Sequence, residues 1–362
     1  MNLYTEEAKR QGFCVPLHAL RGLAAIIVLF SHIQHRITEA FPSVFNMYIF
    51  NGSAAVNFFY VLSGLVVGAS LAKVGVSYSS TAIFFHRRVF RIMPLMFVTV
   101  TLGGLYLLFV DPYMKYVLIT KEYGEFTLSK FVAAYIGYSM KPNPPIWSIF
   151  VELVGSILIP LMILAGNRAI NVVLGLIGCV LLSLIPMAFH HHWNFYMVSF
   201  YLGLTILIWG KRFSACLESL PKSVFWLIVA VLFLAFYLAR IFTNAGYGDL
   251  WIVYWETLCI TPIVAIVYYM PERFSFLYAG VFRFLGDISF SLYLTHMLLL
   301  VVLLNAMVAI FGNTGLAAIL FCAFSVVLSL MVATISYREI EMKGMRLGET
   351  LRKQFKPIQE VS

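Results

Sequence analysis

Charged residues are scarce in this chain of 362 residues, since Asp, Glu, Lys and Arg together make up only 11% of it. An ordinary soluble domain carries about 25% charged residues, so a soluble globular protein is excluded. Hydrophobic residues make up 61%, and the mean hydropathy is +0.90. An intrinsically disordered chain is excluded as well, because such chains are poor in aromatic residues and Phe, Trp and Tyr here make up 16%. A polytopic membrane protein remains.

Cysteine is also scarce, and no two of the five cysteines have the Cys-x-x-Cys spacing of a zinc or redox site. Three of them lie inside apolar runs, so we expect buried thiols rather than disulfides. The five are Cys14, Cys179, Cys216, Cys259 and Cys322. The run His190-His191-His192 stands in a short loop before Trp193, where anchoring at the membrane interface is favoured over metal binding. We therefore predict no metal site.

Long apolar runs are abundant. A membrane-spanning helix needs about 20 mostly apolar residues, and ten runs approach this length: 17–36, 51–72, 91–110, 145–165, 169–189, 193–209, 223–243, 251–270, 288–310 and 315–336. They are continuous rather than alternating, which favours helices over barrel strands, and the run 131–140 is too short to cross. The sequence therefore predicts an all-α polytopic integral membrane protein with about ten transmembrane helices.

Neither an internal repeat nor a Pro-, Gly- or Ser-rich linker divides the chain. We therefore expect one membrane-embedded domain over residues 1–343, followed by a short basic cytoplasmic tail over residues 344–362.

The net charge of +9 is distributed unevenly. An even number of spans puts both termini on one side of the membrane. If that side is the cytoplasm, the outer loops hold few basic residues, namely Arg36, Lys115, Lys121, Lys130 and Lys141. Most of the others then lie inside, as the positive-inside rule requires. The chain is predicted to have its N-terminus and C-terminus in the cytoplasm, and the basic charge needs no nucleic-acid partner.

A few ionisable residues lie within the spans, where charge is costly and commonly marks function. His32 follows Arg21 in the first span by about three helical turns, or about 16 Å, so both side chains can face the same interior. Glu152 and Glu256 lie in the fourth and eighth spans at a depth comparable to that of His32, whereas His296 lies deeper in the ninth. This pattern predicts an acid–base site in the outer half of the helix bundle.

Basic residues gather at the inner end of the third span. Arg87, Arg88 and Arg91 lead into it, and Arg88 and Arg91 share a helix face. Together with Arg21 they suit a phosphate-rich ligand, because guanidinium groups bind phosphate in bidentate fashion. The alternative is that they only contact the anionic lipid leaflet.

The intramembrane residues have structural alternatives too. His32 alone is compatible with an interhelical hydrogen bond. The alternative for Glu152 or Glu256 is a structural ion pair with an arginine such as Arg240, at the end of the seventh span.

Five motifs in order along the chain resemble acyltransferase family 3, the integral-membrane enzymes that O-acylate bacterial cell-surface glycans and related molecules. The first is residues 17–25 (LHALRGLAA), with His32 completing an Arg-x10-His spacing. The others are residues 57–64 (NFFYVLSG), 88–94 (RVFRIMP), Trp147-Ser148 with Glu152, and 285–296 (LGDISFSLYLTH). The resemblance extends from about residue 14 to residue 343.

One element departs from the family pattern. Members commonly end the last span with Tyr-Arg…Glu-x-Pro, whereas this chain has Tyr337-Arg338 and Glu341 but Lys343 at the proline position. A different geometry is therefore expected after the last span.

The resemblance implies an acyl-CoA donor on the cytoplasmic side, acetyl-CoA by default, used as a co-substrate rather than as a permanently bound cofactor. It implies a carbohydrate hydroxyl as acceptor on the other side and a place in the bacterial inner membrane. Arg21, Arg88 and Arg91 are then expected to hold the CoA phosphates, and His32 to be the general base or the acyl carrier, oriented by Glu152. The predicted substrate-binding residues are Asn57, Trp147, Ser148, Glu256 and His296. A protein partner is left undefined.

A different class of function is also open. Interior His and Glu side chains and a basic inner mouth suit a proton-coupled transporter or a glycan flippase. The chain shows neither two-half symmetry nor paired broken helices, which weighs against a carrier. An acyltransferase of another membrane fold is a further alternative.

Overall fold

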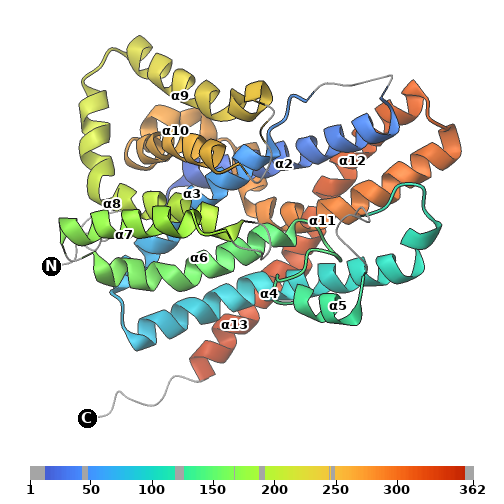
Figure 1. Ribbon diagram of the computed structural model, residues 1–362, viewed down its shortest axis with the longest axis horizontal. Coiled ribbons are helices and arrows are strands. Elements are labelled where there is room, and N and C mark those ends of the chain that lie inside the picture. The colour runs from blue at the N-terminus through green and yellow to red at the C-terminus, as the bar shows by residue number, and fades with distance from the viewer. Residues whose placement is uncertain are drawn as a thin grey trace. The chain divides into compact units, whose positions relative to one another are not determined.

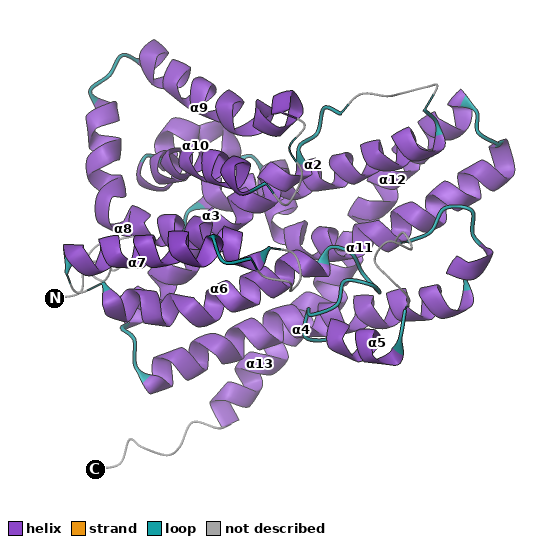
Figure 2. Cartoon of the chain, viewed as in Figure 1, coloured by secondary structure: helices purple, strands orange, loops and turns teal. Residues whose placement is uncertain are grey.

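The computed structural model describes residues 13–42, 48–118, 126–166, 168–186, 192–243, 245 and 249–354. Within these residues the chain is helical and contains no strand (Figure 2). The long helices are α2 (Val15–Ala40), α3 (Gly52–Val74), α4 (Tyr78–Phe109), α6 (Ile146–Ala165), α8 (Met197–Glu218), α9 (Lys222–Thr243), α10 (Leu250–Tyr269), α11 (Gly280–Phe311) and α12 (Gly315–Ser336). The all-α prediction is confirmed.

Shorter elements connect these helices or extend them. They are η1 (Asp111–Tyr113), α5 (Leu128–Ala134), α7 (Ala169–Ser183), η3 (Trp193–Tyr196), η4 (Pro271–Tyr278), the π-helical turn η5 (Tyr337–Glu341) and α13 (Met342–Gln354). The apolar run 131–140, predicted not to cross, contributes only to the seven-residue α5.

Nine of the described helical segments are long and apolar enough to cross a membrane. The tenth predicted span corresponds to α7, which is apolar but only 15 residues long. Such a helix measures about 22 Å, against a hydrocarbon core of about 30 Å. The number of apolar helices thus agrees with the prediction, whereas the cytoplasmic placement of both termini stays a prediction that depends on α7.

Two helices begin earlier than the apolar runs predict. α4 begins at Tyr78 rather than near residue 91, because Ser77 caps it in a reciprocal capping box with Ser80. Arg87, Arg88 and Arg91 are therefore helical residues and not part of a loop. α11 begins at Gly280 rather than near residue 288, so the whole 285–296 motif is helical. The first turn of α4 is polar, and Arg283 and Asp287 interrupt the apolar residues at the start of α11, so the apolar pattern missed both starts.

The chain forms two compact units. The first contains α2, α3, α6 to α10 and the first turns of α11, up to Ser289. Its centre is α3 packed against α8 and α10, with α9 on α10 and α7 on α8 (Figure 1). The second contains α4, α5, the rest of α11, α12 and α13.

In the second unit α13 packs along α4 (Figure 1). Residues 344–354 belong to this packed helix. The division into a domain over residues 1–343 and a cytoplasmic tail over residues 344–362 stays a prediction. All five cysteines are free thiols. Of the three in apolar runs, Cys179 and Cys259 are buried as expected, whereas Cys322 is only partly buried.

Candidate active site

The first turns of α2 are fastened to the first turns of α11. Arg21 donates from Nε to Ser289 Oγ and from Nη2 to the Gly286 carbonyl, each over 2.9 Å. His18 Nε2 lies 2.9 Å from Asp287 Oδ1. The motifs at 17–25 and 285–296 therefore form one packed junction, in which Arg21 already has two protein partners. Contact of Arg21 with CoA phosphates stays a prediction.

Glycines make this junction possible. A Cβ atom on Gly22 would lie 2.4 Å from the Leu285 carbonyl carbon, and one on Gly286 would lie 2.5 Å from the His18 carbonyl oxygen. Any side chain at either position would separate the two helices.

His32 lies about three turns beyond Arg21 on α2, and its side chain is partly exposed. Its Nδ1 lies 3.0 Å from the Val28 carbonyl oxygen. A carbonyl oxygen only accepts, so this contact assigns the proton to Nδ1 and leaves the lone pair of the neutral ring on Nε2. Nε2 is then the atom of His32 that can take up a proton or attack a carbonyl carbon.

The helix around His32 is tied to the segment that leads into α3. Gln34 Oε1 accepts hydrogen bonds from the backbone N–H groups of Ile49 and Phe50, over 2.6 and 3.1 Å. Gly52, at the start of α3, approaches Ser31 so closely that a Cβ would lie 2.8 Å from the Ser31 hydroxyl oxygen. These contacts, one at Ser31 and one at Gln34, fix the backbone on both sides of His32.

The Trp-Ser motif opens α6. The Trp147 ring packs 5.8 Å from that of Tyr196, which in turn lies 4.8 Å from the ring of Tyr60 in the 57–64 motif. Ser148 is buried, whereas Glu152 is partly exposed. Tyr196 thus joins two of the family-like motifs, and sequence reasoning had not singled it out. The orientation of His32 by Glu152 stays a prediction, as do the substrate contacts of Trp147 and Ser148.

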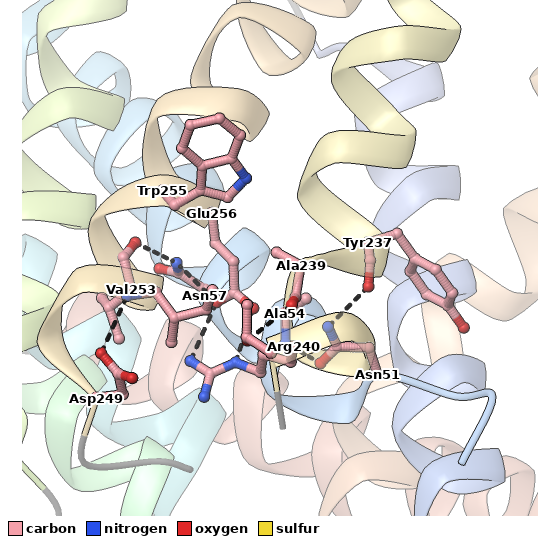
Figure 3. A network of polar contacts seen from close by, with 12 residues as sticks. Asn51, Ala54, Asn57, Tyr237, Ala239, Arg240, Asp249, Val253, Trp255 and Glu256 are labelled. Carbon is pink, nitrogen blue, oxygen red and sulfur yellow. Dashed lines mark hydrogen bonds and ion pairs between the residues drawn. The ribbon is translucent and has the colours of Figure 1, made fainter. Parts of the chain in front are cut away.

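A buried ion pair joins α9 and α10 (Figure 3). Arg240 donates from Nε to Glu256 Oε1 over 2.7 Å and from Nη2 to Glu256 Oε2 over 3.2 Å. The side chains are 7% and 0% exposed, respectively. For Glu256 the structure therefore shows the arginine pairing that the sequence left open as an alternative.

Asn57 completes this network (Figure 3). Its amide nitrogen lies 3.1 Å from both the Val253 carbonyl and Thr257 Oγ1, and 3.4 Å from Glu256 Oε2. Its amide oxygen accepts from Ser199 Oγ over 2.6 Å. Asn57 and Glu256 are thus brought together, but both are fully buried among protein groups. Substrate contact by either residue stays a prediction and would require the network to open.

The second unit contains Arg88, Arg91 and His296. The guanidinium of Arg88 lies over the Phe84 ring at 5.9 Å, and the Arg91 side chain is 41% exposed. Sequence reasoning did not assign a role to Glu341, yet its Oε1 lies 3.9 Å from Arg91 Nε. The Glu of the Tyr-Arg…Glu element was the signal that pointed to it.

His296 is almost fully buried, and its Nδ1 lies 3.0 Å from the Leu292 carbonyl oxygen. Beside it, Asn143 donates to the Leu294 carbonyl over 2.9 Å and so ties the segment before α6 to α11. Sequence reasoning missed Asn143, because nothing in the local pattern separates it from an ordinary loop residue. A substrate contact by His296 stays a prediction.

Among the described residues, no group of three or more His, Cys, Asp and Glu side chains is arranged to hold a metal ion. His190 and His191 of the triple-histidine run lie outside the described residues, and His192 stacks on Phe195.

Comparison with protein families gives one result. A family model described as an acyltransferase domain, that of acyltransferase family 3, matches residues 17–337. The match includes all five motifs and the whole of the Arg21–His32 helix segment. Searches of curated proteins and of solved structures found no match.

Proposed function

The chain belongs to acyltransferase family 3, and from that premise we propose that this membrane acyltransferase moves an acyl group, acetyl by default, from cytoplasmic acyl-CoA to a glycan hydroxyl on the opposite side of a bacterial inner membrane. The observation that carries the proposal is the family match over residues 17–337, which contains Arg21 and His32 on one helix.

The proposed binding site for acyl-CoA is formed by two arginines of α4. Arg88 and Arg91 are one turn apart on this helix, and the side chain of Arg91 is well exposed. Guanidinium groups bind phosphate oxygens through paired N–H donors, and CoA carries several such oxygens. The cytoplasmic placement of these arginines follows from the predicted topology.

The chemistry rests on His32. With its Nδ1–H on the Val28 carbonyl, Nε2 removes the proton from the acceptor hydroxyl while the hydroxyl oxygen attacks the thioester carbonyl. The tetrahedral intermediate collapses with loss of the CoA thiolate, which takes the proton from His32 and leaves as CoA-SH. Glu152 stabilises the imidazolium in between. In the other route, Nε2 itself attacks the thioester and passes the acyl group on; we favour the direct route.

A proton-coupled transporter or a glycan flippase is the competing function. Family membership argues against it, because acyltransferase family 3 is defined by group transfer. The two functions differ in outcome, since a carrier moves its substrate unchanged whereas an acyltransferase leaves a new ester on the acceptor.

The test uses the full-length protein in proteoliposomes with radiolabelled acetyl-CoA and de-O-acetylated bacterial glycans. We expect label on the glycan, and its loss in His32→Gln. His35→Gln is the matched control, because His35 is exposed on the same helix and is expected to retain activity. Uptake of label without a covalent product would support the carrier, and near wild-type transfer by His32→Gln would remove both routes.

A further inference from the structure

We propose that Glu341 is a positioning residue that holds the guanidinium of Arg91 in the orientation that binds the phosphates of the acyl donor. The inference rests on the proposed function, because it concerns the same donor site. It concerns the second unit only, where α4, the second part of α11, the π-turn η5 and α13 meet.

The buried carboxylate of Glu341 lies next to the exposed guanidinium of Arg91. Glu341 is 1% exposed, and its Oε2 accepts a hydrogen bond from Ser291 Oγ over 2.9 Å. Its Oε1 lies 3.9 Å from Arg91 Nε, while the Arg91 side chain is 41% exposed. At 3.9 Å this contact is an ion pair without a hydrogen bond, and the guanidinium nitrogen that it joins to the carboxylate is Nε. The two Nη groups remain available for a bidentate contact with phosphate.

The π-turn explains how Glu341 comes to lie inside. α12 ends at Ser336, and residues Tyr337–Glu341 form one π-helical turn before α13 begins. One extra residue in a turn rotates the following side chains by about 100° relative to an uninterrupted α-helix. Such turns are frequent at functional sites. Two residues earlier, Glu339 is 58% exposed and pairs with Lys343, so the same stretch holds one inward and one outward carboxylate.

The contact between α13 and α4 keeps Glu341 opposite Arg91. A Cβ on Gly344 would lie 2.7 Å from Pro94 Cγ and 2.8 Å from the Phe90 carbonyl oxygen. Pro94 has no N–H, so this carbonyl lacks its usual helical donor and α13 packs directly on it. One turn further on, His86 Nε2 lies 2.8 Å from the Gly348 carbonyl. These contacts define the register of the two helices.

The departure from the family pattern fits this arrangement. Family members commonly have proline where this chain has Lys343. A proline there would remove a backbone N–H and tend to break the helix. Lys343 lets the helix continue into α13, which then packs along α4.

Positioning and simple electrostatics make opposite predictions for Glu341→Gln. The substitution removes a negative charge close to a phosphate site, so attraction alone would make CoA bind more tightly. If Glu341 acts by orienting Arg91, the same substitution weakens CoA binding, because the flexible guanidinium must be ordered at the moment of binding.

The experiment measures the Kd of CoA for the full-length protein in nanodiscs by isothermal titration calorimetry, and the KM and kcat of acetyl transfer. Glu341→Gln is expected to raise both the Kd of CoA and the KM of acetyl-CoA about tenfold, while kcat changes by less than about twofold. With acetyl-pantetheine, a thioester donor without the phosphates, KM is expected to stay unchanged. Arg91→Gln should give the same loss, and the double variant no further loss, as expected for two residues that act through one contact.

Glu339→Gln is the matched control, because it removes an exposed carboxylate from the same turn. It is expected to behave as wild type. CoA binding by Glu341→Gln that is equal to or tighter than that of wild type would overturn the proposal. Equal losses with both donors, together with a lower unfolding temperature, would overturn it in favour of a purely structural role.

Failure of the proposed function gives a different result. If the wild-type protein binds CoA but transfers no acetyl group, the acyltransfer proposal fails and the comparison of Kd values still decides the role of Glu341. If wild type does not bind CoA, the donor site and the positioning role are both wrong.

Discussion

Gly64 on α3 and Gly203 on α8 each face the backbone of the other helix. A Cβ on Gly64 would lie 2.0 Å from the Phe200 carbonyl oxygen, and one on Gly203 would lie 2.0 Å from the Val61 carbonyl oxygen. Small residues of this kind allow membrane helices to approach closely. The close crossing brings Ser199 within hydrogen-bond distance of Asn57, 2.6 Å between Oγ and Oδ1.

Gly203→Ala is therefore expected to destabilise the first unit. The added methyl group meets backbone, which cannot rotate away, and overpacking of this kind costs about 1–3 kcal/mol. Thermal unfolding in a mild detergent measures the effect. Gly178→Ala on α7 is the control, because no atom lies within 4 Å of the added Cβ. Equal unfolding temperatures for the two variants would contradict the role of the close crossing.

Arg240→Met is expected to destabilise the protein by about 3–5 kcal/mol, because it leaves the Glu256 carboxylate buried without its cation. Replacing both partners by apolar residues, Arg240→Met with Glu256→Leu, is expected to recover much of this loss. Urea or thermal unfolding of the three proteins checks the order. The prediction is wrong if the double variant is no more stable than Arg240→Met alone.

Gly344→Ala is expected to weaken donor binding from a distance. Its methyl group would clash with Pro94 and the Phe90 carbonyl, which shifts α13 and with it Glu341. The KM of acetyl-CoA should rise several-fold while the KM of acetyl-pantetheine changes little. Gly315→Ala, at the start of α12, meets no atom within 4 Å and is the control. Unchanged kinetics in Gly344→Ala would show that the α13 register does not matter for the donor.

Isotope exchange distinguishes the direct route at His32 from the route through an acylated His32. The direct route predicts that labelled CoA does not exchange into acetyl-CoA when the acceptor is absent, because no acyl-enzyme forms. Exchange is measured by separating the two thioesters chromatographically after incubation with the protein. Exchange that requires no glycan and is lost in His32→Gln would instead establish an acylated His32.

The predicted topology depends on whether α7 crosses. With α7 as a span, a green fluorescent protein fused to the C-terminus is expected to fluoresce and alkaline phosphatase fused there is expected to be inactive, since both termini then face the cytoplasm. A 15-residue helix crosses only if the bilayer thins or flanking side chains reach the interface. Active phosphatase at the C-terminus would refute the predicted orientation.

Much of the fold was predictable, because a membrane imposes length and composition on each helix. The apolar runs predicted the long helices. The misjudged starts of α4 and α11 lie where polar or charged residues precede or interrupt the apolar run. The shortness of α7 was not visible in the sequence, where the apolar run continues to residue 189.

The candidate site was predictable only as a set of residue types. Arg21 and His32 share one helix, so their relation follows from helical geometry alone. Glu256 illustrates the opposite case: its carboxylate was expected near substrate, but it lies against Arg240 and Asn57. Pairing between separate helices depends on how those helices pack, and no local pattern encodes that.

The sparsity of charge determined that this chain is a membrane protein, because so few polar groups cannot cover a water-soluble surface. The continuous apolar runs determined that it is helical. The order of its motifs determined the family. Only the tertiary structure decided which of the few buried charges are already paired, since a hydrogen bond needs atoms within about 3 Å and residues far apart in sequence reach that distance only after folding. The hydrogen bond from Ser291 to Glu341 is one such contact, and the ion pair of Arg240 with Glu256 is another.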